Sequence, residues 1–96
     1  MADASVVRND EKSRYEIWAD EKLAGFADYR ERADRTIFTH TEIGDEFGGR
    51  GLGKILATEA VKDADGRDRT IVPLCPFIAA FLKKNPDAAR KVDWSE

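Results

Sequence analysis

The octapeptide GGRGLGKI, residues 48–55, places four glycines and two cations directly before an amphipathic segment. Backbone N–H groups at the start of a helix are unpaired and the helix dipole is positive there, so a glycine-rich turn at this point favours a bound phosphate. The stretch nearly matches the G-x-x-x-x-G-K-[ST] nucleotide loop, but Ile55 stands where that loop has its magnesium-binding hydroxyl. The two remaining interpretations are a loop for a different phosphate and a surface turn that is merely rich in glycine.

The length and the charge of the chain exclude several classes of protein. A chain of 96 residues, 42% hydrophobic, predicts a single domain over 1–96 and has no room for the repeated crossovers of an ATPase. Sixteen Lys and Arg against nineteen Asp and Glu give a net charge of −3 with the signs interleaved. Nucleic acid is therefore not an expected partner, because its phosphate backbone favours a positive surface.

The cysteine count and the apolar runs indicate the compartment. Cys75 is the one cysteine, which excludes an internal disulfide and fits a reduced compartment. One histidine and one cysteine, thirty-five residues apart, do not form a zinc site without carboxylate ligands, so no metal is expected. The N-terminus lacks the pattern of a signal peptide, and the longest apolar run, FIAAFL, is far short of the roughly 18 residues of a membrane span. We expect a soluble cytoplasmic protein, or a nuclear one if the cell has a nucleus, without a membrane partner.

Alternation of apolar and polar residues predicts four strands in the first half of the chain, at residues 5–8, 14–19, 23–32 and 35–43. The last, RTIFTHTEI, gives the strongest signal because five of its nine residues are β-branched. Gly25 is expected to mark a bulge or a close backbone approach. Short turns between the strands predict an antiparallel meander.

The pattern changes to helical spacing after this meander, predicting a helix from about Gly51 to Asp63. TIVPL, residues 70–74, is a short buried strand, and Pro76 begins a second helix that stops at Asn85 and the following proline. The crossover helix makes the fourth and fifth strands parallel. The predicted fold class is α+β with a mixed sheet. Its glycine loop lies at the carboxyl end of a strand, where α/β sheets bind ligands.

A strand, a G-x-G-x-[GA] turn and a helix, following an antiparallel meander, resemble the GNAT superfamily of acyl-coenzyme A N-acyltransferases, whose loop binds the coenzyme A pyrophosphate. Gly49, Gly51 and Gly53 match that loop, whereas Gly48 stands where the family has Arg or Gln. Short single-domain members also carry His-Thr-Glu before the loop and Cys-Pro at the last helix, as in THTEI (39–43) and LCPFIAAFLKKNP (74–86). The likeness covers essentially the whole chain and implies a minimal GNAT-like domain without the N-terminal helices that shape the acceptor site in larger relatives.

The resemblance implies acetyl-coenzyme A as co-substrate and an amine as acceptor, either a small molecule or a protein lysine. It indicates the coenzyme more clearly than the acceptor, and neither the acceptor nor the oligomeric state can be predicted, although a monomer is possible. The residues that it assigns to the coenzyme are Ile43, Gly48, Gly49, Arg50, Gly51, Leu52, Gly53, Lys54, Cys75 and Pro76.

Two residues of the fourth strand are candidates for acid–base catalysis. Phe38, His40 and Glu42 alternate, so they are expected on one face of the strand. His40 or Glu42 could take a proton from the attacking amine. The alternatives are a hydrogen-bonded structural histidine and a carboxylate that accepts from the N–H groups of the glycine loop.

Cys75 is the third candidate because it precedes a helix, where the dipole favours a thiolate. The alternative is an inert buried cysteine. Parallel fourth and fifth strands end at the same edge of the sheet, so His40 and Cys75 are expected to converge on one cleft. Cys75 then either accepts the acetyl group, with His40 as its base, or only protonates the leaving thiolate while the amine attacks directly.

Two functions of different class fit the sequence. The first is an N-acetyltransferase that moves an acetyl group from acetyl-coenzyme A to an amine. The second is a non-catalytic coenzyme A or anion-binding module that acts through protein partners, suggested by the missing acceptor-shaping helices and by Gly48.

Overall fold

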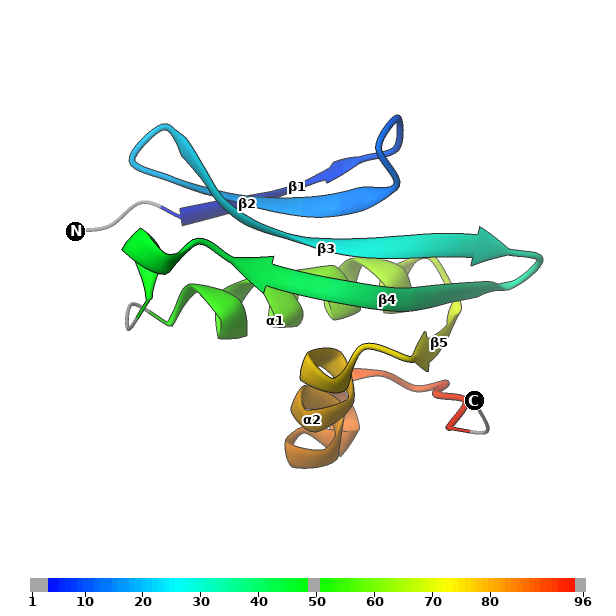
Figure 1. Ribbon diagram of the computed structural model, residues 1–96. Coiled ribbons are helices and arrows are strands. Elements are labelled where there is room, and N and C mark those ends of the chain that lie inside the picture. The colour runs from blue at the N-terminus through cyan, green and yellow to red at the C-terminus, as the bar shows by residue number, and fades with distance from the viewer. Residues whose placement is uncertain (1–3, 49–50, 95–96) are drawn as a thin grey trace.

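The computed structural model describes residues 4–48 and 51–94, in which five strands form a mixed sheet in the order β1-β2-β3-β4-β5 (Figure 1). The first four strands pair antiparallel, and β5 lies parallel to β4. The predicted α+β class and the parallel fourth–fifth pair are confirmed. The elements in order are β1 (Ala4–Asn9), β2 (Arg14–Ala19), β3 (Lys22–Arg32), β4 (Arg35–Ile43), η1 (Asp45–Phe47), α1 (Leu52–Gly66), β5 (Thr70–Pro73), α2 (Pro76–Lys84) and η2 (Pro86–Ala88).

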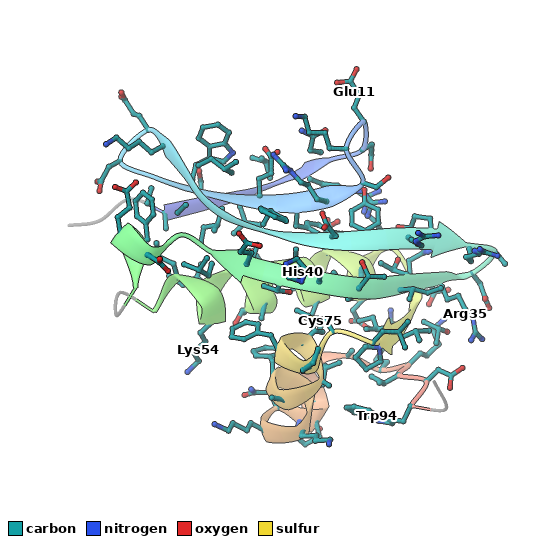
Figure 2. All side chains as sticks on the ribbon, in the orientation of Figure 1. Glu11, Arg35, His40, Lys54, Cys75 and Trp94 are labelled. Carbon is teal, nitrogen blue, oxygen red and sulfur yellow. The ribbon has the colours of Figure 1, made fainter. Side chains whose placement is uncertain are left out.

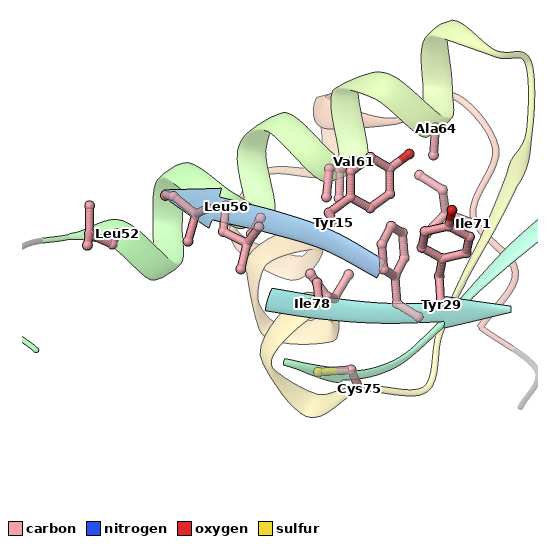
Figure 3. Close-up of a cluster of buried hydrophobic side chains, with 14 of the residues drawn as sticks. Tyr15, Tyr29, Leu52, Leu56, Val61, Ala64, Ile71, Cys75 and Ile78 are labelled. Atoms are coloured by element: carbon pink, nitrogen blue, oxygen red, sulfur yellow. The ribbon is translucent and has the colours of Figure 1, made fainter. Parts of the chain in front are cut away.

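The core lies between α1 and one face of the sheet (Figure 3). The apolar stripe of α1 continues through Ala64, which is fully buried, and the helix therefore runs to Gly66 instead of the predicted Asp63. Ile78 and Leu82 of α2 join the same cluster. We call the opposite face of the sheet the outer face, and its residues include Arg14, Glu16 and Trp18 of β2 and Phe26 and Asp28 of β3, which alternate with the core residues.

A bulge in β4 changes which side chains face the core. Tyr29 pairs with Phe38 and Asp28 pairs with His40, so Thr39 is an extra residue in β4. Phe38 is fully buried in the core, whereas His40 is exposed on the outer face. The expectation that Phe38, His40 and Glu42 share one face is therefore wrong, because the inserted residue reverses the alternation of the strand.

A second irregularity lies at Gly25, as predicted. Ile17 pairs with Gly25 and Trp18 pairs with Leu23, which leaves Ala24 as an extra residue in β3. A Cβ atom on Gly25 would collide with the backbone carbonyl of Glu42. Only glycine allows β3 and β4 to approach this closely.

β4 and β5 diverge after four paired residues. The last pair is Phe38 with Pro73, and the Cys75 N–H then donates to the Phe38 carbonyl at 2.9 Å. Residues His40–Ile43 of β4 keep their pairing with β3 but have no strand on their other side within the described residues. We call this unpaired edge of β4, beside the start of α2, the gap.

A polar network closes the opposite end of the core. The Tyr15 hydroxyl donates to Asp63 of α1 at 2.6 Å and accepts from Arg8 at 2.8 Å, while Arg8 also donates to Glu31 at 2.7 Å. Burial and the bond to Asp63 raise the pKa of Tyr15. Burial raises the pKa of Asp63 as well, but hydrogen bonds from Tyr15 and Arg67 outweigh that effect and leave it below its ordinary 3.8. The network ties β1, β2 and β3 to the end of α1.

Candidate active site

The glycine loop ends in a backbone conformation that only glycine adopts readily. Gly51 precedes α1 with φ +73°, and a Cβ atom placed on it would meet nothing within 4 Å. The first helical bond runs from the Ile55 N–H to the Gly51 carbonyl. The preceding N–H groups of the first turn therefore have no acceptor within the helix, and no acidic side chain lies in that turn. Gly49 and Arg50, which the sequence assigns to the coenzyme, lie outside the described residues.

The other loop residues have different surroundings. Leu52 is buried in the core, so only its backbone can face a ligand, while Lys54 is exposed. A Cβ atom on Gly53 would lie 2.8 Å from the Phe77 ring, so this glycine lets α1 and α2 pack closely. Gly48 has φ −63° and donates its N–H to the Asp45 carbonyl, a conformation that any residue adopts. The backbone therefore does not explain why glycine replaces the family's Arg or Gln.

A groove of about 340 Å³ lies between the start of α1 and the exposed side of α2. Lys54 and Lys84 supply its charge, and Phe77 and Phe81 supply aromatic surface. The sequence marked Lys54 as a candidate but not Phe77 or Phe81, because an apolar stripe at helical spacing is also the pattern of a core helix. The groove begins beside the glycine loop and could hold the flat, charged end of a ligand whose phosphates lie there.

Cys75 lies at the N-cap of α2 and is 2% exposed. Its Sγ donates to the Thr41 hydroxyl at 3.2 Å. Thr41 is a residue that sequence reasoning missed, because without the Thr39 bulge it would face away from the core. The bulge turns Thr41 toward the gap, and it thereby becomes the contact between β4 and the start of α2.

His40, which Figure 2 labels, forms a separate pair with Glu42 on the outer face. His40 Nε2 lies 3.0 Å from Glu42 Oε1, and the two side chains are 58% and 62% exposed. The His40 ring also lies 6.2 Å from the Phe26 ring, centroid to centroid. Cys75 contacts Thr41 instead, which projects to the other face of β4, so the expected convergence of His40 and Cys75 at hydrogen-bond distance is not found.

Neither a metal cluster nor a membrane helix is found in the described part of the chain. Within residues 4–48 and 51–94, no three His, Cys, Asp or Glu side chains are grouped so that they could hold a metal ion. The helices described there are too short or too polar to cross a bilayer.

A protein-family model and several solved structures are similar to this chain. The family model for GCN5-related N-acetyl-transferase matches residues 14–92. No curated protein matches the chain at a significant level. Among solved structures, a GCN5-like putative N-acetyltransferase from Staphylococcus aureus is 23% identical with a TM-score of 0.69, and the match covers 100% of this chain and 97% of the other.

A second similar structure is larger. It is the ribosomal-protein-alanine N-acetyltransferase from Brucella melitensis biovar Abortus 2308, 20% identical with a TM-score of 0.61. The match covers 86% of this chain and 64% of that enzyme. At these identities the two structures support the fold, and the family model supports the family. The chain belongs to the GCN5-related N-acetyltransferase family, a family of acyltransferases.

Proposed function

We propose that this chain transfers the acetyl group of acetyl-coenzyme A to an amine, with the coenzyme lying in the gap. The observation that carries the proposal is the divergence of β4 from β5 after Phe38, beside a helix start preceded by Gly51 in the left-handed conformation. An extended ligand with amide groups can pair with an open strand edge as an added strand does. The pantetheine arm of coenzyme A has that chemistry.

The same placement suggests where the pyrophosphate and the adenosine end of the coenzyme would bind. Its pyrophosphate would accept from the N–H groups of Leu52, Gly53 and Lys54, with the Lys54 ammonium nearby. Its adenosine end would enter the groove beside Phe77 and Lys84. Ile43 and Pro76 border the gap, at the end of β4 and the start of α2. Arg50 and Gly49 remain candidates from the resemblance alone.

Direct attack by the amine fits the side-chain positions better than a covalent intermediate. The amine nitrogen would bond to the thioester carbonyl carbon, the carbon–sulfur bond would break, and the departing thiolate would take a proton from the Cys75 thiol. His40 or Glu42, on the outer face, or solvent would accept the proton from the amine. A covalent route needs a general base within about 3.2 Å of Cys75 Sγ. The side chain that contacts Sγ is the Thr41 hydroxyl, which is not a general base.

Ligand binding is tested by thermal unfolding. Coenzyme A at a hundred times its Kd is expected to raise the free energy of unfolding by about 2.7 kcal/mol. Mg-ATP is expected to have no such effect. Gly51→Val should abolish the shift, because valine resists a positive φ and would occupy space next to the loop. Gly66→Val, at an open position at the other end of α1, is the matched control and should keep the shift.

Catalysis is tested by release of free coenzyme A with and without candidate amines. Acetyl transfer, a lower rate in Cys75→Ser and an unmodified Cys75 by intact mass after mixing with acetyl-coenzyme A would support direct attack. An acetylated Cys75 would instead support the covalent route. Binding without transfer to any amine would favour the alternative, a non-catalytic coenzyme A-binding module.

A further inference from the structure

Three arginines line a groove on the outer face of β3, β4 and β5. The groove has a volume of about 440 Å³, and Arg30, Arg32 and Arg35 surround its apolar floor. We call it the arginine groove. The floor includes Val72, which is 2% exposed yet lies outside the continuous core cluster under α1. The residues that line the groove are Arg30, Arg32, Arg35, Ile37, Thr39, Val72 and Leu74.

The three arginines of the groove carry more positive charge than the neighbouring carboxylates neutralise. Arg32 and Arg35 stand directly opposite each other in the β3–β4 register, which places like charges across the two strands. Arg35 has carboxylate partners, Asp93 at 2.6 Å and Asp34 at 3.5 Å. Within residues 4–48 and 51–94, the side chains of Arg30 and Arg32 have no hydrogen-bond or ion-pair partner. Two guanidinium groups are thus free to bind an anion.

The nearby carboxylates of Glu31 and Asp28 do not pair with Arg30 or Arg32 in the described part of the chain. Glu31 lies between the two arginines in sequence but projects to the core side, where it accepts from Thr36 and Arg8. Asp28 lines an adjoining depression that shares Arg30, Arg32 and Thr39 with the groove. The chain as a whole carries a net charge of −3, so this positive surface runs against the overall charge.

The arginine groove leads to the gap. Thr39 and Leu74 are the residues next to the last β4–β5 pair, Phe38 with Pro73, and both line the groove. One end of the groove therefore reaches the point where the two strands diverge. His40 and Glu42, further along β4, share the outer face with it.

We propose that the arginine groove holds an anionic group of the acceptor, so that the acceptor is a primary amine that also bears a carboxylate or a phosphate. This inference rests on the proposed function. Guanidinium groups bind either anion with paired, charge-assisted hydrogen bonds. The apolar floor of Ile37 and Val72 accommodates an aliphatic linker, and the amine at its other end reaches the gap. A polyamine would bring a second cation against Arg30 and Arg32 and is disfavoured.

The first test compares amines that differ only in the charge at their far end: 4-aminobutanoate, butylamine and 1,4-diaminobutane, with O-phosphoethanolamine as the phosphate form. We expect kcat/KM for an anionic amine to exceed that for 1,4-diaminobutane by about tenfold or more, and added salt to reduce the difference. The better of the two anions identifies the preferred group. Equal kcat/KM across the series would overturn the inference.

The variant Arg30→Gln/Arg32→Gln should remove this preference and leave the coenzyme A stabilisation unchanged. Lys22→Gln/Lys62→Gln, which removes two exposed cations outside the groove, is the charge-matched control and should keep the preference. A double variant that discriminated between the amines as the wild type does would contradict the inference.

A binding measurement separates this inference from the proposed function. The arginine Nε–Hε signals of Arg30 and Arg32 are followed by NMR during titration with 4-aminobutanoate, with coenzyme A present. We expect saturating shifts that butylamine does not produce. Acetyl transfer without these shifts would overturn the inference alone. Shifts without acetyl transfer to any amine would support the anion site and contradict the proposed enzyme.

Discussion

The two halves of β4 both contain threonine and isoleucine but have different environments. Residues Arg35–Phe38 pair with strands on both edges, and Thr36 and Phe38 are fully buried. Residues His40–Ile43 pair with β3 and, within the described residues, with no second strand, and His40 and Glu42 are exposed. We call these the closed half and the open half. One inserted residue, Thr39, marks the boundary between them.

The difference shows how a single strand serves both stability and binding. In the closed half, β-branched and aromatic side chains fill the core, and the backbone groups are paired on both sides. In the open half, one edge of the backbone is not paired with a strand of the described chain. The bulge turns Thr41 toward Cys75 while His40 faces outward. A bulge next to a functional site commonly re-aims side chains in this way.

The largest expected effect is on the closed half. Phe38→Ala removes a fully buried ring that packs 6.0 Å from Tyr15, centroid to centroid. It should lower the free energy of unfolding by about 3–5 kcal/mol. Urea unfolding followed by far-UV circular dichroism measures this loss. A loss below about 1 kcal/mol would mean that the closed half is not part of the core.

The second test concerns the polar network that adjoins the closed half through Thr36 and Glu31. Hydrogen bonds from Tyr15 and Arg67 hold the pKa of Asp63 below its ordinary value despite burial, so Asp63 stabilises the fold above about pH 4 and loses this effect as the pH falls. Asp63→Asn should cost about 1–2 kcal/mol at pH 7 after allowance for solvent screening. The cost should shrink at pH 2–3, which urea unfolding at several pH values can measure. A cost that stayed constant down to pH 2 would contradict the assignment.

The third test concerns the remaining paired edge of the open half. Gly25→Ala would press a Cβ atom against the Glu42 carbonyl and the Ile43 side chain. It should lower the free energy of unfolding by about 1–3 kcal/mol and weaken coenzyme A binding, because β4 must shift. Gly66→Ala, at a position with open space, is the control. Normal coenzyme A affinity in Gly25→Ala would indicate that the open half tolerates displacement.

The smallest expected effect on stability is at His40. His40→Ala should change the free energy of unfolding by less than about 0.5 kcal/mol, because the side chain is exposed and its contacts are Glu42 and Phe26. A fall in the rate of acetyl transfer with little change in stability would indicate a role in proton transfer. A large destabilisation would instead identify His40 as a structural residue and reduce the contrast between the two halves.

Local patterns determined most of the fold. Apolar periodicity, the β-branched run at 35–43, Pro76 and the glycine loop predicted the strands and the helices, because each depends on residues close together in sequence. The parallel direction of β5 followed from the helix that connects it to β4. The resemblance to the acyltransferase family rested on those same local motifs, and the family model confirmed it. Gly25 was also predictable, since only glycine permits the close approach that it makes.

Tertiary structure decided how the candidate residues group. The Thr39 bulge leaves no signal in a strand with β-branched residues on both sides of it, because an inserted residue is defined by its partner strand. The bulge placed His40 and Cys75 on opposite faces of β4. The end of β5 at Pro73 and the clustering of Arg30, Arg32 and Arg35 depend on register in the same way. Sequence by itself determined which elements form and which residues have the required chemistry. The pairing of distant strands decided which of these residues meet, because a shift of one residue moves a side chain to the opposite face of the sheet.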